Sequence, residues 1–189
     1  MYSFEFKNGD VLELKGIKHA AFASQETHCY EASVYFNGKI IGWVNNDGYG
    51  GSDTFNAKPI KHGADHVCAK GSFADNNKLW NTLETRIAEE HPQYFMEWDK
   101  SWNKMTLEIW CCNQVNKFLS AKDFNRYMKS KVVFIQPDEP KAIRYFSFKG
   151  VRSITQQHID HIKSKYPTYQ ILNDMPKAEA LDLWVSCNA

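Results

Sequence analysis

Hydrophobic and polar residues alternate along much of the first third of the chain, which is the pattern of half-buried β-strands. Residues 2–6 and 11–15 form two such runs, and the turn dipeptide Asn8-Gly9 lies between them. The sequence therefore predicts a hairpin over these residues. Residues 17–23 continue the hydrophobic pattern and fit a third strand.

The clearest local signal is a second hairpin. Residues 29–36 and 39–44 are both rich in β-branched and aromatic residues, and Asn37-Gly38 joins them. An Asn-Gly pair in this setting predicts a type I′ turn, in which both central residues have a positive φ. Because side chains alternate along a strand, one face of the first run is expected to point into the core. That face carries Tyr30, Ala32, Val34 and Phe36.

The middle of the chain changes from loop-like to helical patterns. Residues 46–78 are rich in glycine and show no clear period, so they predict a long loop, with 66–71 as a candidate short strand. In residues 79–91, Leu79, Leu83 and Ile87 recur at helical spacing, and Pro92 ends the pattern.

Helical spacing returns after an ambiguous, aromatic-rich stretch at 93–105. Residues 106–119 carry an apolar stripe that includes Leu107, Trp110 and Val115. Ser120 with Asp123 resembles a capping signal, which predicts that a new helix covers 121–130.

The last third mixes strands and helices. Two strands are predicted at 131–136 and 142–148, around a turn at 137–140. Ser153 and Gln156 fit a capping box for a helix over 154–166, and a short strand at 169–174 and a helix at 176–185 are expected to follow.

The order of these elements predicts an α+β fold. An antiparallel N-terminal sheet built from hairpins is followed by helices, a second β-hairpin and C-terminal helices. The length of 189 residues fits a single domain, 1–189, with a β-rich part at 1–75 and a helical or mixed part at 76–189.

The composition indicates in which cellular compartment the protein is expected. No run of about 18 apolar residues occurs that could span a membrane, and the first ten residues lack the basic and apolar regions of a secretory signal. The cysteines number five, and an odd number at irregular positions favours a reducing environment with free thiols. We therefore expect a cytoplasmic protein with no membrane partner.

Charge is unevenly distributed along the chain. The net charge of +1 favours neither a nucleic-acid coat protein nor an acidic DNA mimic. Residues 114–152, however, carry nine basic and three acidic side chains, interleaved with Phe and Tyr. Such a stretch can contact single-stranded nucleic acid, or it can simply be the solvated face of ordinary elements. Its candidate contact residues are Arg126, Arg144, Lys149 and Arg152.

A glycine-rich loop follows the second hairpin, in the run WVNNDGYGGSD from Trp43 to Asp53. It lacks the residue order of a P-loop, of a dinucleotide-binding fingerprint and of a calcium loop. Backbone N–H groups at Gly48, Gly50 and Gly51 could still face an anion, and Asp47 with Asp53 could bind a hard cation. The alternative is a turn that needs a positive φ at several positions. Both interpretations remain open at this point.

The hypothesis that the chain is a hydrolase is based on side chains in and before this loop. Glu26 and His28 are two residues apart and can share a strand face as an acid–base pair. Together with Asp47 and Asp53 they would supply acid–base or metal-binding groups for a phosphodiester or nucleotide substrate. A Cys–His dyad of His28 with Cys29 is disfavoured, because adjacent residues on a strand point to opposite faces.

Two further groups have the side chains of metal sites. His62, His66 and Cys68 offer three zinc ligands, with Cys111 or Cys112 as a fourth, although Gly63 and the surrounding polar residues favour an unliganded loop. His158 and His161 are neighbours on a predicted helix beside Asp160, but His158 falls on the apolar stripe and fits a packed core residue better. The favoured expectation is no metal and no cofactor.

Residues 24–53 resemble a segment of uncharacterised accessory proteins of phages and mobile elements. The shared pattern is an E-T-x-C start, an Asn/Asp-Gly turn before K-x-x-G, an Asn and a G-x-G-G loop; residues 165–184 also resemble the C-terminal end of that group. Those proteins typically have a His in the glycine loop where this chain has Tyr49, which weakens any imidazole chemistry there. The resemblance implies a small protein made inside a bacterial host, of a kind that often disables a host factor.

The favoured hypothesis is a non-catalytic binding protein that inhibits a host defence macromolecule, such as a CRISPR-type nucleic-acid-guided complex. The partner would be a host protein or ribonucleoprotein, and the chain itself would be a monomer or homodimer. Aromatic and arginine side chains dominate binding hot spots, and the candidate contact residues are Trp43, Asp47, Tyr49, Gly50, Gly51, Trp98, Trp102, Arg126, Arg144, Lys149 and Arg152. The alternatives are the hydrolase described above, a protein that binds a nucleotide signal through residues 46–53, and a virion-associated protein.

Overall fold

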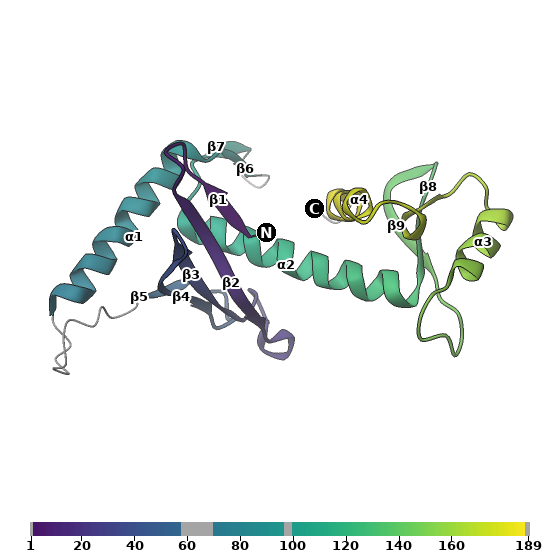
Figure 1. The fold of residues 1–189 in the computed structure, drawn as a ribbon, viewed down its shortest axis with the longest axis horizontal. Helices are drawn as coiled ribbons and strands as arrows, with labels where there is room; N and C mark the ends of the chain where they lie inside the picture. Colours follow the sequence, from purple (N-terminus) through teal and green to yellow (C-terminus); the bar gives the residue numbers. More distant parts are fainter. Residues whose placement is uncertain (1, 58–69, 97–99, 188–189) are drawn as a thin grey trace. The chain divides into compact units, whose positions relative to one another are not determined.

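A computed structural model describes residues 2–57, 70–96 and 100–187 (Figure 1). The expected α+β fold is confirmed: an antiparallel sheet comes first, followed by helices, a further hairpin and C-terminal helices. The chain divides into two compact units, Met1–Val115 and Asn116–Ala189. The division falls inside the helix α2 (Leu107–Ser130) and not at the change of composition near residue 75. Each unit is described separately below.

The N-terminal unit contains a five-stranded antiparallel sheet in the order β1-β2-β3-β4-β5. Its strands are β1 (Ser3–Glu5), β2 (Val11–His19), β3 (Tyr30–Phe36), β4 (Lys39–Asn46) and β5 (Thr54–Ala57). Neighbours in the sheet are also neighbours in the sequence, so the whole sheet is a meander of consecutive strands.

The second hairpin has the predicted geometry. Asn37 and Gly38 have φ values of 49° and 73°, as a type I′ turn requires. The predicted core face of β3 is confirmed for Tyr30, Ala32 and Val34, which are buried, whereas Phe36 at the end of the strand is half-buried.

The expected third strand at 17–23 was wrong. Residues 17–19 belong to β2, which continues past Gly16 through an irregularity in its pairing with β3 between Lys15 and Lys18. Residues Ala21–Ala23 form a short 3-10 helix, η1. Gly16 has a φ of 62°, which allows the backbone to change direction without ending the strand.

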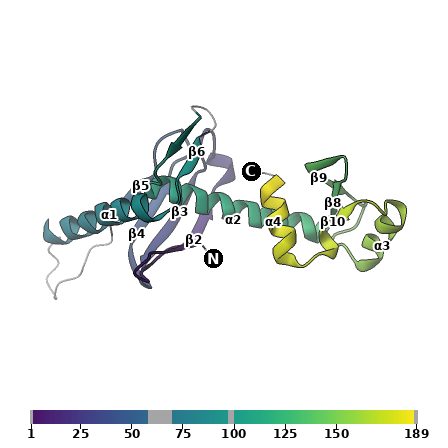
Figure 2. The same ribbon diagram turned by 90° about the horizontal axis from the view of Figure 1, so that it is seen from above.

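The predicted long loop at 46–78 also contains regular structure. Residues 54–57 form β5, and the end of the stretch belongs to the helix α1 (Lys70–Glu90), which begins before the apolar stripe that identified it. Most of the candidate strand at 66–71 lies outside the described residues. Phe55 of β5 stacks on Trp80 of α1, with ring centroids 3.8 Å apart. This contact joins the helix to the edge of the sheet, where β5 lies next to α1 (Figure 2). The start of α1 was not predicted because hydrophobic periodicity detects only the part of a helix that packs against other elements. The strand β5 was not predicted because it forms by pairing with β4, and its own sequence has no clear strand pattern.

The ambiguous stretch at 93–105 forms a small hairpin of β6 (Tyr94–Met96) and β7 (Ser101–Asn103). The helix α2 then runs without interruption through Ser120 and Asp123, so the predicted start of a new helix there was wrong. Phe124 is buried in the core of the C-terminal unit, so packing beyond Ser120 favours continuation of the helix through the capping-like pair.

The C-terminal unit contains a three-stranded antiparallel sheet in the order β10-β8-β9. Its elements are β8 (Val132–Gln136), β9 (Glu139–Phe146), α3 (Gln156–Lys165), β10 (Gln170–Ile171), the short 3-10 helix η2 (Leu172–Asp174) and α4 (Lys177–Cys187). The expected strand at 169–174 is thus divided between β10 and η2.

Side-chain alternation along β8 builds a core on each face of this sheet. Val133 and Ile135 pack with Phe124 and Trp184, on the side of α4. Val132 and Phe134 pack with residues of α3 on the other side. Figure 1 shows α3 and α4 on opposite sides of β8 and β9.

The predicted capping box of α3 is displaced by two residues. Thr155, not Ser153, occupies the N-cap position. The Nδ1 atom of His158 accepts the Thr155 N–H at 3.2 Å and lies 2.7 Å from the Thr155 hydroxyl. His158 also packs edge-on against Phe148, so this histidine holds the start of the helix.

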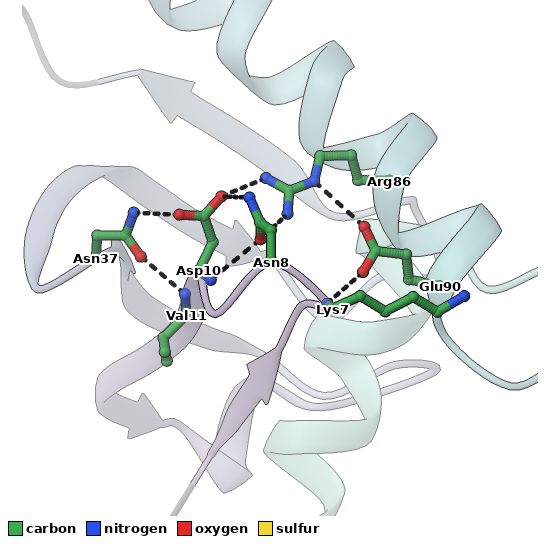
Figure 3. A network of polar contacts seen from close by, with 7 residues as sticks. All are labelled: Lys7, Asn8, Asp10, Val11, Asn37, Arg86 and Glu90. Carbon is green, nitrogen blue, oxygen red and sulfur yellow. Dashed lines mark hydrogen bonds and ion pairs between the residues drawn. The ribbon is translucent and has the colours of Figure 1, made fainter.

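A polar cluster fastens α1 to the two turns of the sheet (Figure 3). The guanidinium of Arg86 donates to Asp10 and to Asn8, in both cases at 2.7 Å. Asp10 also accepts a hydrogen bond from Asn37 in the second hairpin at 2.8 Å. These hydrogen bonds, with that of Asn37 first, lower the pKa of Asp10 to about 2. The cluster therefore depends on an ionised Asp10.

The described residues contain no helix that is both long and apolar enough to cross a membrane. Four cysteines lie in the described part of the chain, Cys29, Cys111, Cys112 and Cys187, and all four are free thiols.

Candidate functional site

Two loops meet at one end of the N-terminal sheet, and we call them together the tip: residues 20–29, between β2 and β3, and residues 47–53, after β4. The carbonyl oxygen of Gly48 accepts the backbone N–H groups of Gln25, Glu26 and Thr27, at 3.0, 3.0 and 3.3 Å. Three donors from one loop therefore converge on a single acceptor of the other, and each loop fixes the position of its neighbour.

The side chain of Asn46, at the end of β4, forms hydrogen bonds with both loops. Its side-chain oxygen accepts the Thr27 hydroxyl at 2.7 Å and the Gly48 N–H at 2.8 Å. Its side-chain nitrogen donates to the Gly51 carbonyl at 2.9 Å and to Asp53 at 3.0 Å. An amide offers two donors and two acceptor positions, so this buried side chain is fully engaged.

Asp53 is a structural acid at the base of the tip. Its carboxylate accepts the Tyr30 hydroxyl and the Asn46 amide, and its backbone N–H donates to Glu108 at the start of α2 at 3.2 Å. Burial raises the pKa of Asp53, and the hydrogen bonds from Tyr30 and Asn46 oppose that effect only in part. Burial, followed by the contact with Asp53, raises the pKa of Tyr30, so the hydroxyl keeps its proton and acts as the donor.

The glycines of the loop differ in what they require. Gly48 has a φ of +90°, and a Cβ there would lie 2.2 Å from the Ala23 carbonyl oxygen. Gly50 has a φ of +87°, and a Cβ would meet the Glu26 carboxylate at 2.2 Å. A Cβ on Gly51 would meet nothing within 4 Å. The close approach of the two loops therefore depends most on Gly48.

Three backbone N–H groups of the loop, at residues 48–50, are already engaged within the protein. The Gly48 N–H is bound by Asn46, the Tyr49 N–H donates to Asp47 at 3.1 Å, and the Gly50 N–H lies 3.4 Å from the Thr27 hydroxyl. An anion cradle needs such groups to point at the ligand. In this conformation they stabilise the loop, which supports the interpretation of 47–53 as a structured turn.

The tip presents aromatic and acidic side chains to solvent. Phe22 is 93% exposed and Tyr49 is 61% exposed, and within the described residues neither ring contacts another aromatic ring. Glu26, His28 and Asp47 are also exposed. The sequence reasoning identified Tyr49 but missed Phe22, because it placed that residue inside a strand.

The candidate catalytic residues have separate surroundings. The Glu26 carboxylate lies against Gly50, whereas the His28 ring packs against His19, with centroids 5.4 Å apart. Asp47 accepts a backbone hydrogen bond within its own turn, and Asp53 belongs to the network with Tyr30 and Asn46. Each of the four thus has a contact that supports the tip itself.

The other predicted contact residues lie outside the tip. Trp43 is half-buried in β4 opposite Ser33 and Asn56. Trp102 is 66% exposed and packs against Phe95 in the β6–β7 hairpin. Trp98 lies outside the described residues.

The basic candidates all lie in the C-terminal unit. Arg126 pairs with Asp123 at 3.0 Å and Arg144 with Glu139 at 2.7 Å. Lys149 and Arg152 are exposed.

The proposed zinc ligands His62, His66 and Cys68 lie outside the described residues, so the zinc hypothesis stays a prediction. Within 2–57, 70–96 and 100–187, no group of three or more His, Cys, Asp or Glu side chains could hold a metal ion.

Comparison with known proteins adds no relative. No family model matches this chain, and no curated protein or solved structure matches it either.

Proposed function

We propose that this chain is an accessory protein that binds a host macromolecule through the tip of its N-terminal unit and thereby inhibits it. The resemblance of residues 24–53 to phage and mobile-element proteins suggests the setting, the cytoplasm of an infected bacterium. The target would belong to the defence machinery of that host, such as a CRISPR-type nucleic-acid-guided complex.

The supporting observation is that two aromatic rings, Phe22 and Tyr49, are exposed on loops that hydrogen bonds hold in place. Phe22 is 93% exposed and Tyr49 is 61% exposed, while the loops that carry them are joined by the hydrogen bonds to Gly48 and Asn46. Large apolar side chains in water are unfavourable unless a partner covers them. Because the scaffold is already ordered, binding would cost little conformational entropy.

Charge indicates the chemistry of the partner surface. The tip exposes the carboxylates of Glu26 and Asp47 beside the aromatic rings, and the sequence of the N-terminal unit contains 11 basic and 15 acidic residues, a balance of −4. A complementary surface carries Lys and Arg around an apolar pocket. The nucleic-acid-binding surface of a host protein has this character, and its occupation by the tip would explain inhibition.

The β6–β7 hairpin is the competing surface in this unit. Phe95 and Trp102 are also exposed, at 39% and 66%, but their rings contact each other at 5.4 Å between centroids. Each ring thus covers part of the other, whereas Phe22 is almost completely exposed. This difference favours the tip.

The test is the plaquing of a phage on a bacterium whose nucleic-acid-guided defence restricts it, with the chain expressed in the host. Wild type is expected to restore plaquing. The double variant Phe22→Ser with Tyr49→Ser should lose this effect, because hot-spot aromatics each contribute about 2 kcal/mol or more to binding. The matched double variant Phe95→Ser with Trp102→Ser should keep it.

Two outcomes would overturn the proposal. One is that the wild-type chain fails to restore plaquing in every host tested that has a nucleic-acid-guided defence. The other is that the hairpin variant loses the effect while the tip variant, shown to be folded by circular dichroism, keeps it.

A further inference from the structure

The C-terminal unit contains an open groove on the α3 side of its sheet, with a volume of about 580 Å³. Its lining includes Phe134, Gln136, Arg144, Phe146, Tyr166 and Tyr169. These residues come from β8, from the edge strand β9 and from the segment between α3 and β10. A volume of this size is within the range of small-molecule and nucleotide sites.

Four aromatic rings form the wall of the groove. Phe134 stacks on Phe146 and on Tyr169, with centroids 4.7 and 4.8 Å apart, and the planes lie within 19° and 11° of parallel. Tyr166 likewise stacks on Phe146 and Tyr169. The Gln136 side chain donates to the Tyr169 hydroxyl at 2.6 Å and helps to hold that ring. The four rings thus form one stacked cluster, and a flat ligand would extend it from Tyr166 and Tyr169, which are only half-buried.

Two cations border these rings. Arg144 lines the groove, and the Lys165 ammonium lies 5.6 Å from the centre of the Tyr166 ring. Glu139 pairs with Arg144, but both side chains are about half exposed, and exposed ion pairs contribute little. A phosphate can therefore compete for Arg144. The sequence of this unit contains 12 basic and seven acidic residues, a balance of +5.

We propose that this groove binds single-stranded nucleic acid, with a base stacked on Tyr166 and Tyr169 and the neighbouring phosphates on Arg144 and Lys165. Stacked rings beside cations on a sheet are the chemistry of single-strand recognition. A duplex would not fit, because its bases already stack on one another and are unavailable to the rings. The proposal is independent of the tip, which lies in the other unit.

The test uses the full-length protein and a fluorescein-labelled oligouridylate of about ten nucleotides, titrated by fluorescence anisotropy at about 50 mM salt. Tyr166→Leu, which removes the π-face and keeps an apolar side chain, should weaken binding by about 5- to 150-fold. Its matched control, Tyr49→Leu in the tip, should leave binding unchanged.

A second variant pair tests the phosphate contact without disturbing the aromatic wall. Arg144→Gln should weaken binding and reduce its salt dependence by about one counterion. Lys163→Gln removes another exposed, ion-paired cation of the same unit, and it should change binding by less than about twofold.

Four results would overturn the proposal. They are no binding of the oligonucleotide to wild type, equal binding of a duplex of the same length, equal binding of free uridine monophosphate, and equal losses from Arg144→Gln and Lys163→Gln. If the oligonucleotide does not bind, a peptide at the β9 edge becomes the alternative occupant. Equal binding of uridine monophosphate would indicate a free nucleotide as the ligand. Equal losses from the two cation variants would indicate a diffuse electrostatic attraction. Thermal unfolding of each variant verifies its fold. Failure of this test leaves the tip proposal intact, because Tyr166 plays no part in it.

Discussion

At the scale of single residues, the base of the tip depends on the carboxylate of Asp53, whose burial disfavours its charged form. Asp53 is partly buried, which raises its pKa, and the hydrogen bonds from Tyr30 and Asn46 act in the opposite direction. A buried carboxylate that loses a donor bears the desolvation cost of the unpaired oxygen.

Tyr30→Phe removes one of these donors with almost no change in volume. We expect the free energy of unfolding to fall by about 1–3 kcal/mol at pH 7. The loss should be smaller at pH 4, because the Tyr30 hydrogen bond lowers the pKa of Asp53, and without it the folded protein favours the protonated acid more strongly. Urea denaturation at the two pH values measures this, and an equal loss at both would show that ionisation of Asp53 is not involved.

The glycine loop gives a second test at this scale. Gly48→Ala should reduce the stability of the N-terminal unit by about 2 kcal/mol or more, since it combines a strained backbone with a clash against the Ala23 carbonyl. Gly51→Ala should change stability by less than about 0.5 kcal/mol, because its Cβ enters open space. The two melting temperatures are compared; similar values would mean that the loops do not pack as described.

At the scale of elements, the cluster of Arg86, Asp10 and Asn37 links α1 to both hairpin turns. Asp10 has a folded pKa of about 2, below its ordinary value of 3.8. It therefore contributes stability above its unfolded pKa, and that contribution is lost as the pH falls towards 2.

Asp10→Asn should accordingly lower the melting temperature at pH 7, and the difference from wild type should shrink between pH 4 and pH 2. Glu31→Gln is the control, because it breaks an exposed pair with Lys18 in the same sheet and should have little effect. Thermal melts across this pH range provide the measurement. A difference that stays constant down to pH 2 would contradict the role of the Asp10 charge.

Sequence patterns predicted elements where the local signal and the final packing agree. The type I′ turn at Asn37-Gly38 needs only its two residues and the flanking strands, and it was correct. The strand β5 and the first part of α1 were missed, because they are set by pairing with β4 and by helix continuation and not by a local period. The continuity of α2 through Ser120 was missed for a related reason, since buried Phe124 outweighs a capping signal.

The candidate site was predictable only in part. Tyr49, Asp47 and the glycines could be named from the sequence, because loops rich in glycine and polar residues stand out. Phe22 and Tyr30 could not, because their roles depend on the meeting of segments that are separate in the sequence. The aromatic groove has the same property, since Phe134 and Tyr169 are brought together by the pairing of β8 with β10.

At the scale of the whole molecule, charge follows the division of the chain into units. The balance is −4 in residues 1–115 and +5 in residues 116–189, which a net charge of +1 conceals. An acidic, aromatic tip and a basic, aromatic groove are suited to different chemistry. A target that contains both protein and nucleic acid would offer a surface for each.

Photocrosslinking in the infected host tests the central claim most directly. A photoreactive phenylalanine derivative is placed at Phe22, at Tyr49 or, as the matched control, at Trp102, and adducts are identified by mass spectrometry. We predict that positions 22 and 49 crosslink to one and the same host protein of a nucleic-acid-guided defence complex, while position 102 gives no such adduct. Crosslinking to that protein from position 102 alone, or to no common protein from positions 22 and 49, would contradict the account.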